Sequence, residues 1–485
     1  MNREAFLAEF DYDVEKDFDV DHNPATWNTT STKSAHRFWG DETYKIVVVS
    51  AGESRYQSGL SAISPDGNYV AVASGHFVGV YHVASQQHRG KIERLVDPCC
   101  GLYLIPLASN AGYQLVIACS DGSELNGKIY LLELNRDGQQ VQDTPVLGID
   151  GLVQPCMSPI IAELGRRYDL QTVSTLVDAV KVDLTKALEK LQSSLVTKDL
   201  TQLQGTFSGF GSCPVSADGR LLLILTKNQS TQDGNRPPSE LPHIGIFDIG
   251  SHKFTHNVGG HEDAIMWTSF SPNDQYFASA SWDGTFRICY TGTGACKHII
   301  GPTGGQCWSG AWSPDSRHIL LCGMANTHSE GVGNGGRGPL VGVYCVETGE
   351  QIARFKHERL RHWVREVAWS SRGDIAIAHA GELWVWNPFE DVLVTSFAVK
   401  VATPLMRVFA GTTRPIWAEG GKLLLHRNED GTVEVWDRDR NVKWRMQRPK
   451  GAGAKQYTKG LHWAEKEKMV ISFDGDGSLR FYKLE

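Results

Sequence analysis

The stretch GGHEDAIMWTSFSPNDQYFASASWDGTFRICYTGTG, residues 259–294, contains most of one four-stranded unit. The alternation of residues around Trp267 predicts an inner strand, which ends at a Ser-Pro-Asn-Asp turn. Residues 276–281 and 285–290 are β-rich, and the Asp-Gly pair between them is among the strongest short-range hairpin signals. Residues 296–300 would add the outer strand of the unit.

The same unit recurs along the chain of 485 residues, because eight β-rich runs close in a similar way, most on an aromatic or large apolar residue. The residues at which these runs close are Tyr81, Leu132, Phe247, Cys289, Tyr344, Trp386, Trp436 and Tyr482. Once one long insertion is subtracted, the repeat period is roughly 47 residues, close to one four-stranded propeller blade. The sequence therefore predicts an all-β chain folded as a single β-propeller.

The number of inner-strand candidates favours eight blades, with seven as the alternative. A closed ring of blades counts as one domain, because each blade depends on its neighbours. Fourteen tryptophans and fifty glycines fit many short strands, tight turns and aromatic packing between sheets. The blades other than the one quoted above are expected near 56–96, 99–148, 205–257, 303–356, 360–399, 403–439 and from 456 onward.

The unit at 259–294 resembles the WD-repeat family of β-propellers through its Gly-His start, its Ser-Pro-Asn-Asp turn and its Asp-Gly-Thr hairpin. The resemblance implies a buried hydrogen-bonded network that His261, Asp283 and one of Ser279 or Ser281 would form. Cys289 stands where the family places a tryptophan. The resemblance covers about residues 55–485 and implies the fold, but propellers perform many tasks, so it leaves the function open.

The blade at 403–439 shows the part of the WD-repeat pattern that the unit at 259–294 lacks. It has Asp430-Gly431-Thr432 and ends on Trp436-Asp437, but it lacks the Gly-His start. We therefore assign Asp430 and Trp436 to a structural network within that blade, as the resemblance implies.

Residues 1–43 are expected to form an acidic, partly disordered tail ahead of a propeller over 44–485. The net charge of the whole chain is −7, and the first 21 residues hold eight acids against Arg3 and Lys16. The last blade reads as three strands only, whereas residues 44–50 are a spare β-rich run. Since an unpaired edge strand is a liability that closure removes, we expect residues 44–50 to close the ring as its missing outer strand.

A helical insertion is expected over residues 157–204, between blades two and three. Apolar residues from Val173 to Leu195 recur at spacings of three and four, which predicts one stripe along an α-helix. That stripe either packs on the propeller or serves a partner, and homodimerisation through this helix is one form of the second alternative.

Two polar loops, 227–241 and 324–338, and two basic connectors, 356–365 and 443–459, are expected on the same face as the helical insertion. Repeat proteins tend to place insertions on their binding face, and arginine and tryptophan are favoured at interface hot spots. A solvated rim is the alternative for the basic connectors. The candidate protein-binding residues are Arg359, Arg361, His362, Trp363, Trp444, Arg445 and Arg448.

No catalytic, phosphate-binding or metal-binding motif stands out, so the sequence predicts no enzyme activity, no cofactor and no metal. The negative charge disfavours a nucleic-acid binder. No run of 18 apolar residues and no secretory signal occur, and ten scattered cysteines do not suggest a disulfide framework. We expect a cytoplasmic or nuclear protein that is not secreted.

The function that fits these observations is a non-catalytic scaffold for protein–protein interaction, with partners that offer acidic or phosphorylated segments. Two alternatives stay open. One is a propeller enzyme that uses the central channel, as a hydrolase or a quinone-type dehydrogenase. The other is a permanent subunit of a large coat, pore or chromatin complex.

Overall fold

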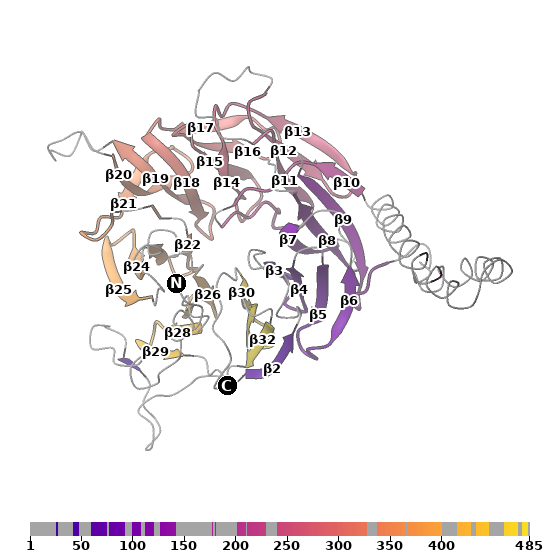
Figure 1. Ribbon diagram of the computed structural model, residues 1–485. Coiled ribbons are helices and arrows are strands. Elements are labelled where there is room, and N and C mark those ends of the chain that lie inside the picture. The colour runs from indigo at the N-terminus through magenta and orange to yellow at the C-terminus, as the bar shows by residue number, and fades with distance from the viewer. Residues whose placement is uncertain are drawn as a thin grey trace.

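Eight sheets stand around a common axis, each contributing one blade of a ring (Figure 1). The expectation of an all-β propeller with eight four-stranded blades is confirmed. The computed structural model describes residues 26–27, 42–47, 60–74, 77–92, 99–107, 112–120, 127–141, 177, 180, 201–209, 211–228, 240–326, 337–361, 363–364, 366–379, 381–399, 415–427, 433–445, 460–473 and 478–483.

The strands of the first four blades run from the centre of the ring to its rim in chain order. Blade one comprises β3 (Leu60–Ile63), β4 (Tyr69–Ser74), β5 (Phe77–His82) and β6 (His88–Ile92). Blade two comprises β7 (Cys99–Pro106), β8 (Gly112–Cys119), β9 (Lys128–Asn135) and β10 (Thr201–Gln204). Blade three comprises β11 (Leu221–Thr226), β12 (His243–Asp248) and β13 (Lys253–Val258), and blade four β14 (Ile265–Phe270), β15 (Tyr276–Ser281), β16 (Phe286–Tyr290) and β17 (Cys296–Ile300).

The next three blades follow the same order. Blade five comprises β18 (Gly304–Trp312), β19 (His318–Asn326), β20 (Arg337–Cys345) and β21 (Gln351–Arg354). Blade six comprises β22 (Glu366–Trp369), β23 (Ile375–His379), β24 (Glu382–Asn387) and β25 (Val392–Ala398). Blade seven comprises β26 (Ile416–Ala418), β27 (Leu423–Arg427), β28 (Val433–Asp437) and β29 (Val442–Arg445).

The ring closes in blade eight, which combines the two ends of the chain. Its three inner strands are β30 (Gly460–Ala464), β31 (Met469–Phe473) and β32 (Ser478–Lys483). The outer strand is β2 (Glu42–Val47), antiparallel to β32, with Ile46 opposite Leu479 (Figure 1). Residues 44–50 were expected in this position, and the described strand runs from Glu42 to Val47.

The inner position of blade three is irregular. Thr206 and Val215 make isolated antiparallel bridges to Leu225 and Leu222, while Cys213 bridges to Ser269 of blade four. The segment between the bridges is rich in glycine, which weakens a regular strand. Blade three therefore keeps four layers, although its innermost layer is not a continuous strand.

The core of the molecule lies between the blades, where eight hydrophobic clusters each join two neighbours. Successive side chains of a strand point to opposite faces of its sheet, and both faces of a blade meet another blade. This explains strands such as β11, Leu-Leu-Leu-Ile-Leu-Thr, which lack polar alternation. One cluster joins Val72 of blade one to Phe473 and Phe481 of blade eight, so the closure is also packed.

The antiparallel order divides the connections between two faces of the disc. We call the face with the second-to-third connections and the blade-to-blade connections the loop face. The opposite face, with the first-to-second and third-to-fourth connections, is the turn face. By this topology the connections from β11 to β12, from β19 to β20 and from β21 to β22 begin and end on the loop face. They correspond to the expected loops 227–241 and 324–338 and the connector 356–365, except that Met324–Asn326 and residues 337–338 belong to β19 and β20.

The placement of the helical insertion between blades two and three is wrong. Thr201–Gln204, expected to end the insertion, forms β10 and pairs with Leu131–Lys128 of β9, with Leu203 packed on the cluster between blades two and three. The outer strand of blade two already begins at Gln140, which bridges to Leu134 of β9 after the turn at residues 136–138. The segment 142–200 thus interrupts this outer strand and does not connect two blades. Of the expected helix only Val177 and Val180 are described, both helical and half-buried, and the rest lies outside the described residues.

A short strand of the N-terminal segment extends blade seven. β1 (Thr26–Trp27) lies parallel to Val442–Lys443 of β29, as a fifth strand on the outer edge. The segment expected as an acidic tail, residues 1–43, therefore contributes β1 and the start of β2. Its remaining residues lie outside the described part of the chain.

Candidate protein-interaction surface

A buried hydrogen-bonded network ties together the loop face of blade four. His261, which is 2% exposed, precedes the inner strand, and its Nδ1 lies 2.7 Å from Asp283 Oδ2. Its Nε2 lies 2.7 Å from Ser279 Oγ in the second strand. Because a carboxylate only accepts, the arrangement requires Nδ1–H to donate to Asp283 and the Ser279 hydroxyl to donate to Nε2.

The Asp283 carboxylate is held charged by its surroundings. Burial would raise the pKa of Asp283, but hydrogen bonds from His261, from Thr285 and from the backbone N–H of Glu262 lower it to about 2. Burial lowers the pKa of His261, which keeps the imidazole neutral and suits its role as a donor to Asp283. Gly284, with φ of 85°, completes the tight turn after Asp283 in a conformation that glycine favours.

The other residues assigned to structural networks have different contacts. The Ser281 hydroxyl donates to the backbone oxygen of Asp263 at 2.9 Å, so Ser279 is the serine that contacts His261. In blade seven, Trp436 Nε1 donates to Asn441 Oδ1 at 3.0 Å, within its own hairpin. Asp430 lies outside the described residues.

Two of the candidate binding arginines lie on the loop face between blades five and six. Arg359 forms an ion pair with Glu382 at the start of β24, and its side chain is 55% exposed. Arg361 is exposed, whereas the neighbouring His362 lies outside the described residues. The two guanidinium groups therefore stand at the surface, where each can offer a forked donor to an anionic group.

Three tryptophans near this connector pack against one another: Trp282 follows β15, Trp308 lies in β18, and Trp363 lies in the connector itself. Trp363 stacks on Trp308, with ring centroids 4.5 Å apart and an interplanar angle of 27°. Trp282 meets Trp308 edge-on at 5.4 Å. Trp308 is buried and the outer two are half-buried, so part of the Trp363 ring is covered by packing within the propeller.

The second basic connector begins inside a strand. Lys443 of β29 is buried, forms an ion pair with Glu434 and lies over the Phe397 ring at 5.0 Å. The backbones of Trp444 and Arg445 pair with Val435 and Glu434 in the same sheet. These three residues therefore belong to the blade, and Arg448 lies outside the described residues.

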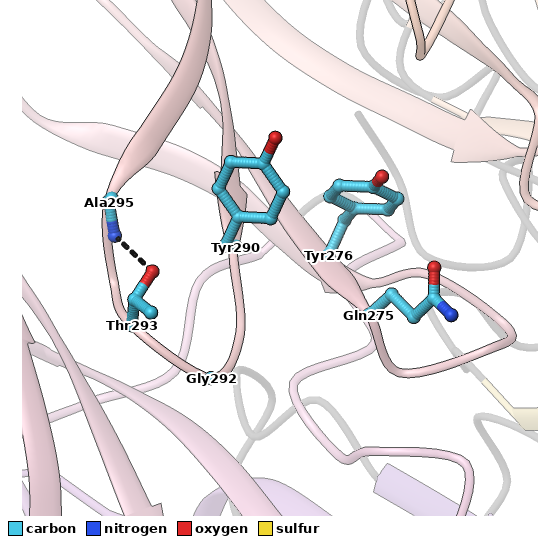
Figure 2. A pocket seen from close by; sticks show the side chains of 6 residues that line it. All are labelled: Gln275, Tyr276, Tyr290, Gly292, Thr293 and Ala295. Atoms are coloured by element: carbon cyan, nitrogen blue, oxygen red, sulfur yellow. Dashed lines mark hydrogen bonds between the residues drawn. The ribbon is translucent and has the colours of Figure 1, made fainter.

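The turn face carries a hollow that sequence reasoning missed, at the outer hairpin of blade four (Figure 2). Its walls include Tyr276 and Tyr290, whose rings lie 5.4 Å apart, and Ala295 of the hairpin. Lys297 lies over both rings, at 5.9 Å and 5.6 Å, and pairs with Glu347 at 3.0 Å. In the sequence, Tyr276 and Tyr290 are the feature that could have indicated this hollow. Such cross-strand aromatic pairs also occur in ordinary packing at the rim of a blade, so they did not stand out.

The described residues contain neither a candidate metal-binding cluster nor a candidate membrane-spanning helix. Among them, no group of three or more histidine, cysteine, aspartate or glutamate side chains could hold a metal ion. Within that same part of the chain, no helix is long and apolar enough to cross a membrane.

The ring of four-stranded blades and the buried His–Asp–Ser network define a β-propeller of the repeat type. The profile of the family "WD domain, G-beta repeat" matches residues 252–289, the segment that contains this network. A Drosophila melanogaster relative, Actin-interacting protein 1, is 22% identical over 253 residues. That match covers 50% of this chain but only 36% of the relative. The chain is thus a β-propeller with one segment that matches a WD repeat.

Proposed function

We propose that the protein is a non-catalytic interaction scaffold that captures other proteins on its loop face. One observation carries the proposal: the connector between blades five and six exposes Arg359 and Arg361, and its Trp363 is fixed by stacking on Trp308 of blade five. A connector fixed in this way loses less entropy on binding, so its exposed charges make an effective recognition site.

The partner chemistry that suits this site is a carboxylate-rich or phosphorylated segment. Arginine pairs with such groups through two parallel hydrogen bonds, which give direction as well as attraction. Arg359 already pairs with Glu382, so an incoming anion would either join that pair or replace it. The name of the Drosophila relative records an interaction with actin, which makes actin the first purified protein to test.

The test compares wild type with the double variant Arg359→Glu and Arg361→Glu. Each protein is immobilised, exposed to purified actin and, separately, to a cell extract, and the bound proteins are identified by mass spectrometry. We expect the double variant to lose the partners that wild type retains. The melting temperature should change little, because exposed charges contribute little to stability.

The matched control reverses two exposed arginines of the turn face, Arg136→Glu and Arg317→Glu. This control changes the net charge by the same amount as the loop-face double variant, and it should retain every partner that wild type retains. Equal capture by wild type and both variants would contradict the role of the loop-face arginines. A metal or chromophore bound in stoichiometric amount to the purified protein would instead contradict the scaffold itself.

A further inference from the structure

Blade four carries two cysteines directly opposite each other on its outer strands. Cys289 of β16 and Cys296 of β17 are partners in the antiparallel register, joined by the hairpin that lines the hollow in Figure 2. Opposite residues of antiparallel strands have Cα atoms about 4.5–5.5 Å apart. This separation lies inside the range of about 4.4–6.8 Å that a disulfide spans.

The two thiols have different surroundings. Cys289 is 1% exposed and packs in the cluster between blades three and four, whereas Cys296 is exposed at the rim. The hydrogen bond from Cys289 and the positive charge of Arg287 lower the pKa of Cys296 to about 7, although burial opposes this. The hydrogen bond with Cys296 and burial raise the pKa of Cys289. Cys296 is therefore more ionised at neutral pH than an ordinary cysteine, and the thiolate is the reactive form.

A second opposite pair in the same molecule shows that register alone does not confer this reactivity. Cys99 and Cys119 are partners between β7 and β8, but both are buried. Burial, together with the neighbouring cysteines, raises the pKa of Cys99 well above its usual value. Neither thiol of that pair combines exposure with an ionised form, so the pair in blade four is the one prepared to react.

We propose that Cys289 and Cys296 form a thiol redox site, which a hydroperoxide converts into a cross-strand disulfide. The Cys296 thiolate attacks the peroxide, so an S–O bond forms, the O–O bond breaks and hydroxide leaves. The product is a sulfenic acid at Cys296. The two electrons for this reduction of the peroxide come from the Cys296 sulfur.

Cys289 then resolves the sulfenic acid. Its sulfur attacks the sulfur of Cys296, an S–S bond forms and the S–O bond breaks. The thiol proton and the departing hydroxyl leave as water, so two thiols and one hydrogen peroxide give one disulfide and two waters. Once Cys296 is a neutral sulfenic acid, the largest cause of the raised pKa of Cys289 is gone, which favours this second attack.

Peptide mapping tests the proposal on the intact protein. Trypsin cleaves after Arg287 and Lys297, so one peptide, Ile288–Lys297, holds both cysteines. After hydrogen peroxide treatment and alkylation, we expect this peptide to appear unalkylated and lighter by two hydrogen masses. The peptide with Cys99 and Cys119 should remain alkylated, and so should the peptide with Cys345, which has no cysteine opposite it.

Two variants separate the roles. In Cys289→Ser, Cys296 should accumulate as a sulfenic acid that dimedone traps, and no disulfide should form. In Cys296→Ser, the peptide should stay reduced. If either variant fails to fold, the rate of iodoacetamide alkylation of wild-type Cys296 against pH gives an independent test, with an expected midpoint near 7.

Three results would overturn the proposal. The first is that wild-type Cys296 is alkylated at neutral pH no faster than Cys100. Cys100 is a second surface cysteine, and partial burial of its thiol raises its pKa. The second is peroxide carrying Cys296 to sulfinic acid without a disulfide, which would remove the resolving role of Cys289. The third is a disulfide that forms in the peptide only after the protein is unfolded.

Discussion

Asp283 links the stability of blade four to pH. Its lowered pKa means that the folded state holds the carboxylate more strongly than the unfolded chain does. The stabilisation is complete above pH of about 4, the pKa range of an ordinary aspartate, and is lost as the pH falls toward about 2. The lowered pKa of His261 gives the same direction of pH dependence: burial opposes protonation in the fold, so stability falls as the pH drops below the ordinary histidine pKa.

The substitution Asp283→Asn should remove the acid-sensitive part of this stabilisation. We expect the variant to be less stable than wild type by roughly 2 kcal/mol at pH 7, since one pKa unit corresponds to about 1.4 kcal/mol. The difference should shrink as the pH falls from about 4 toward 2. Urea denaturation at several pH values measures it, and Asp137→Asn, at an exposed hairpin, serves as the control. A constant difference across this range would contradict the assignment.

The β2 strand should contribute more to the stability of the propeller than its short length suggests. It gives blade eight its outer strand and pairs with β32, whereas β1 adds two residues to a blade that is already complete. Deleting residues 1–51 should lower the melting temperature strongly or prevent folding. Deleting residues 1–40 should shift it by only a few degrees. Equal melting temperatures for the two truncations would mean that β2 does not hold the ring closed.

The β10 strand gives a second test at the scale of elements. Replacing residues 142–200 by a short Gly-Ser linker keeps β9 and β10, so we expect a melting temperature close to that of wild type. A deletion that extends through residue 204 removes β10 and exposes the edge of β9, which should lower the melting temperature and promote aggregation. Circular dichroism and light scattering measure the two effects. Identical behaviour of the two deletions would show that Thr201–Gln204 adds nothing to blade two.

The whole molecule should unfold as one unit, because every hydrophobic cluster is shared by two blades. Leu479→Ala at the closing interface and Leu321→Ala between blades four and five should each cost about 2–5 kcal/mol. Both should shift one common transition, seen alike by tryptophan fluorescence and by circular dichroism. Two separate transitions in either variant would show that the ring unfolds in parts.

The sequence predicted the features that depend on local pattern. Turn residues, strand alternation and the Asp-Gly hairpins recur with a period that specifies blades, and strands β15 and β17 lie at their predicted residues. The resemblance of one unit to WD repeats also implied a network of His261, Asp283 and one of Ser279 or Ser281, all of which belong to one repeat. Local patterns are readable in this way because the backbone near a turn depends mainly on its own residues.

Long-range pairing was decided only by the tertiary structure. Thr201–Gln204 shows no signal in the sequence that it pairs with β9 across the segment 142–200. This pairing places the insertion point within the outer strand of blade two. Lys443 belongs to a run of basic residues and was expected at the surface. It is instead buried against Glu434 of a neighbouring strand and Phe397 of a neighbouring blade. Cys289 and Cys296 are close in sequence, yet their different burial depends on blade three packing against one side. The sequence thus determines the blade, whereas the contacts between distant strands decide which groups are buried, paired or free to react.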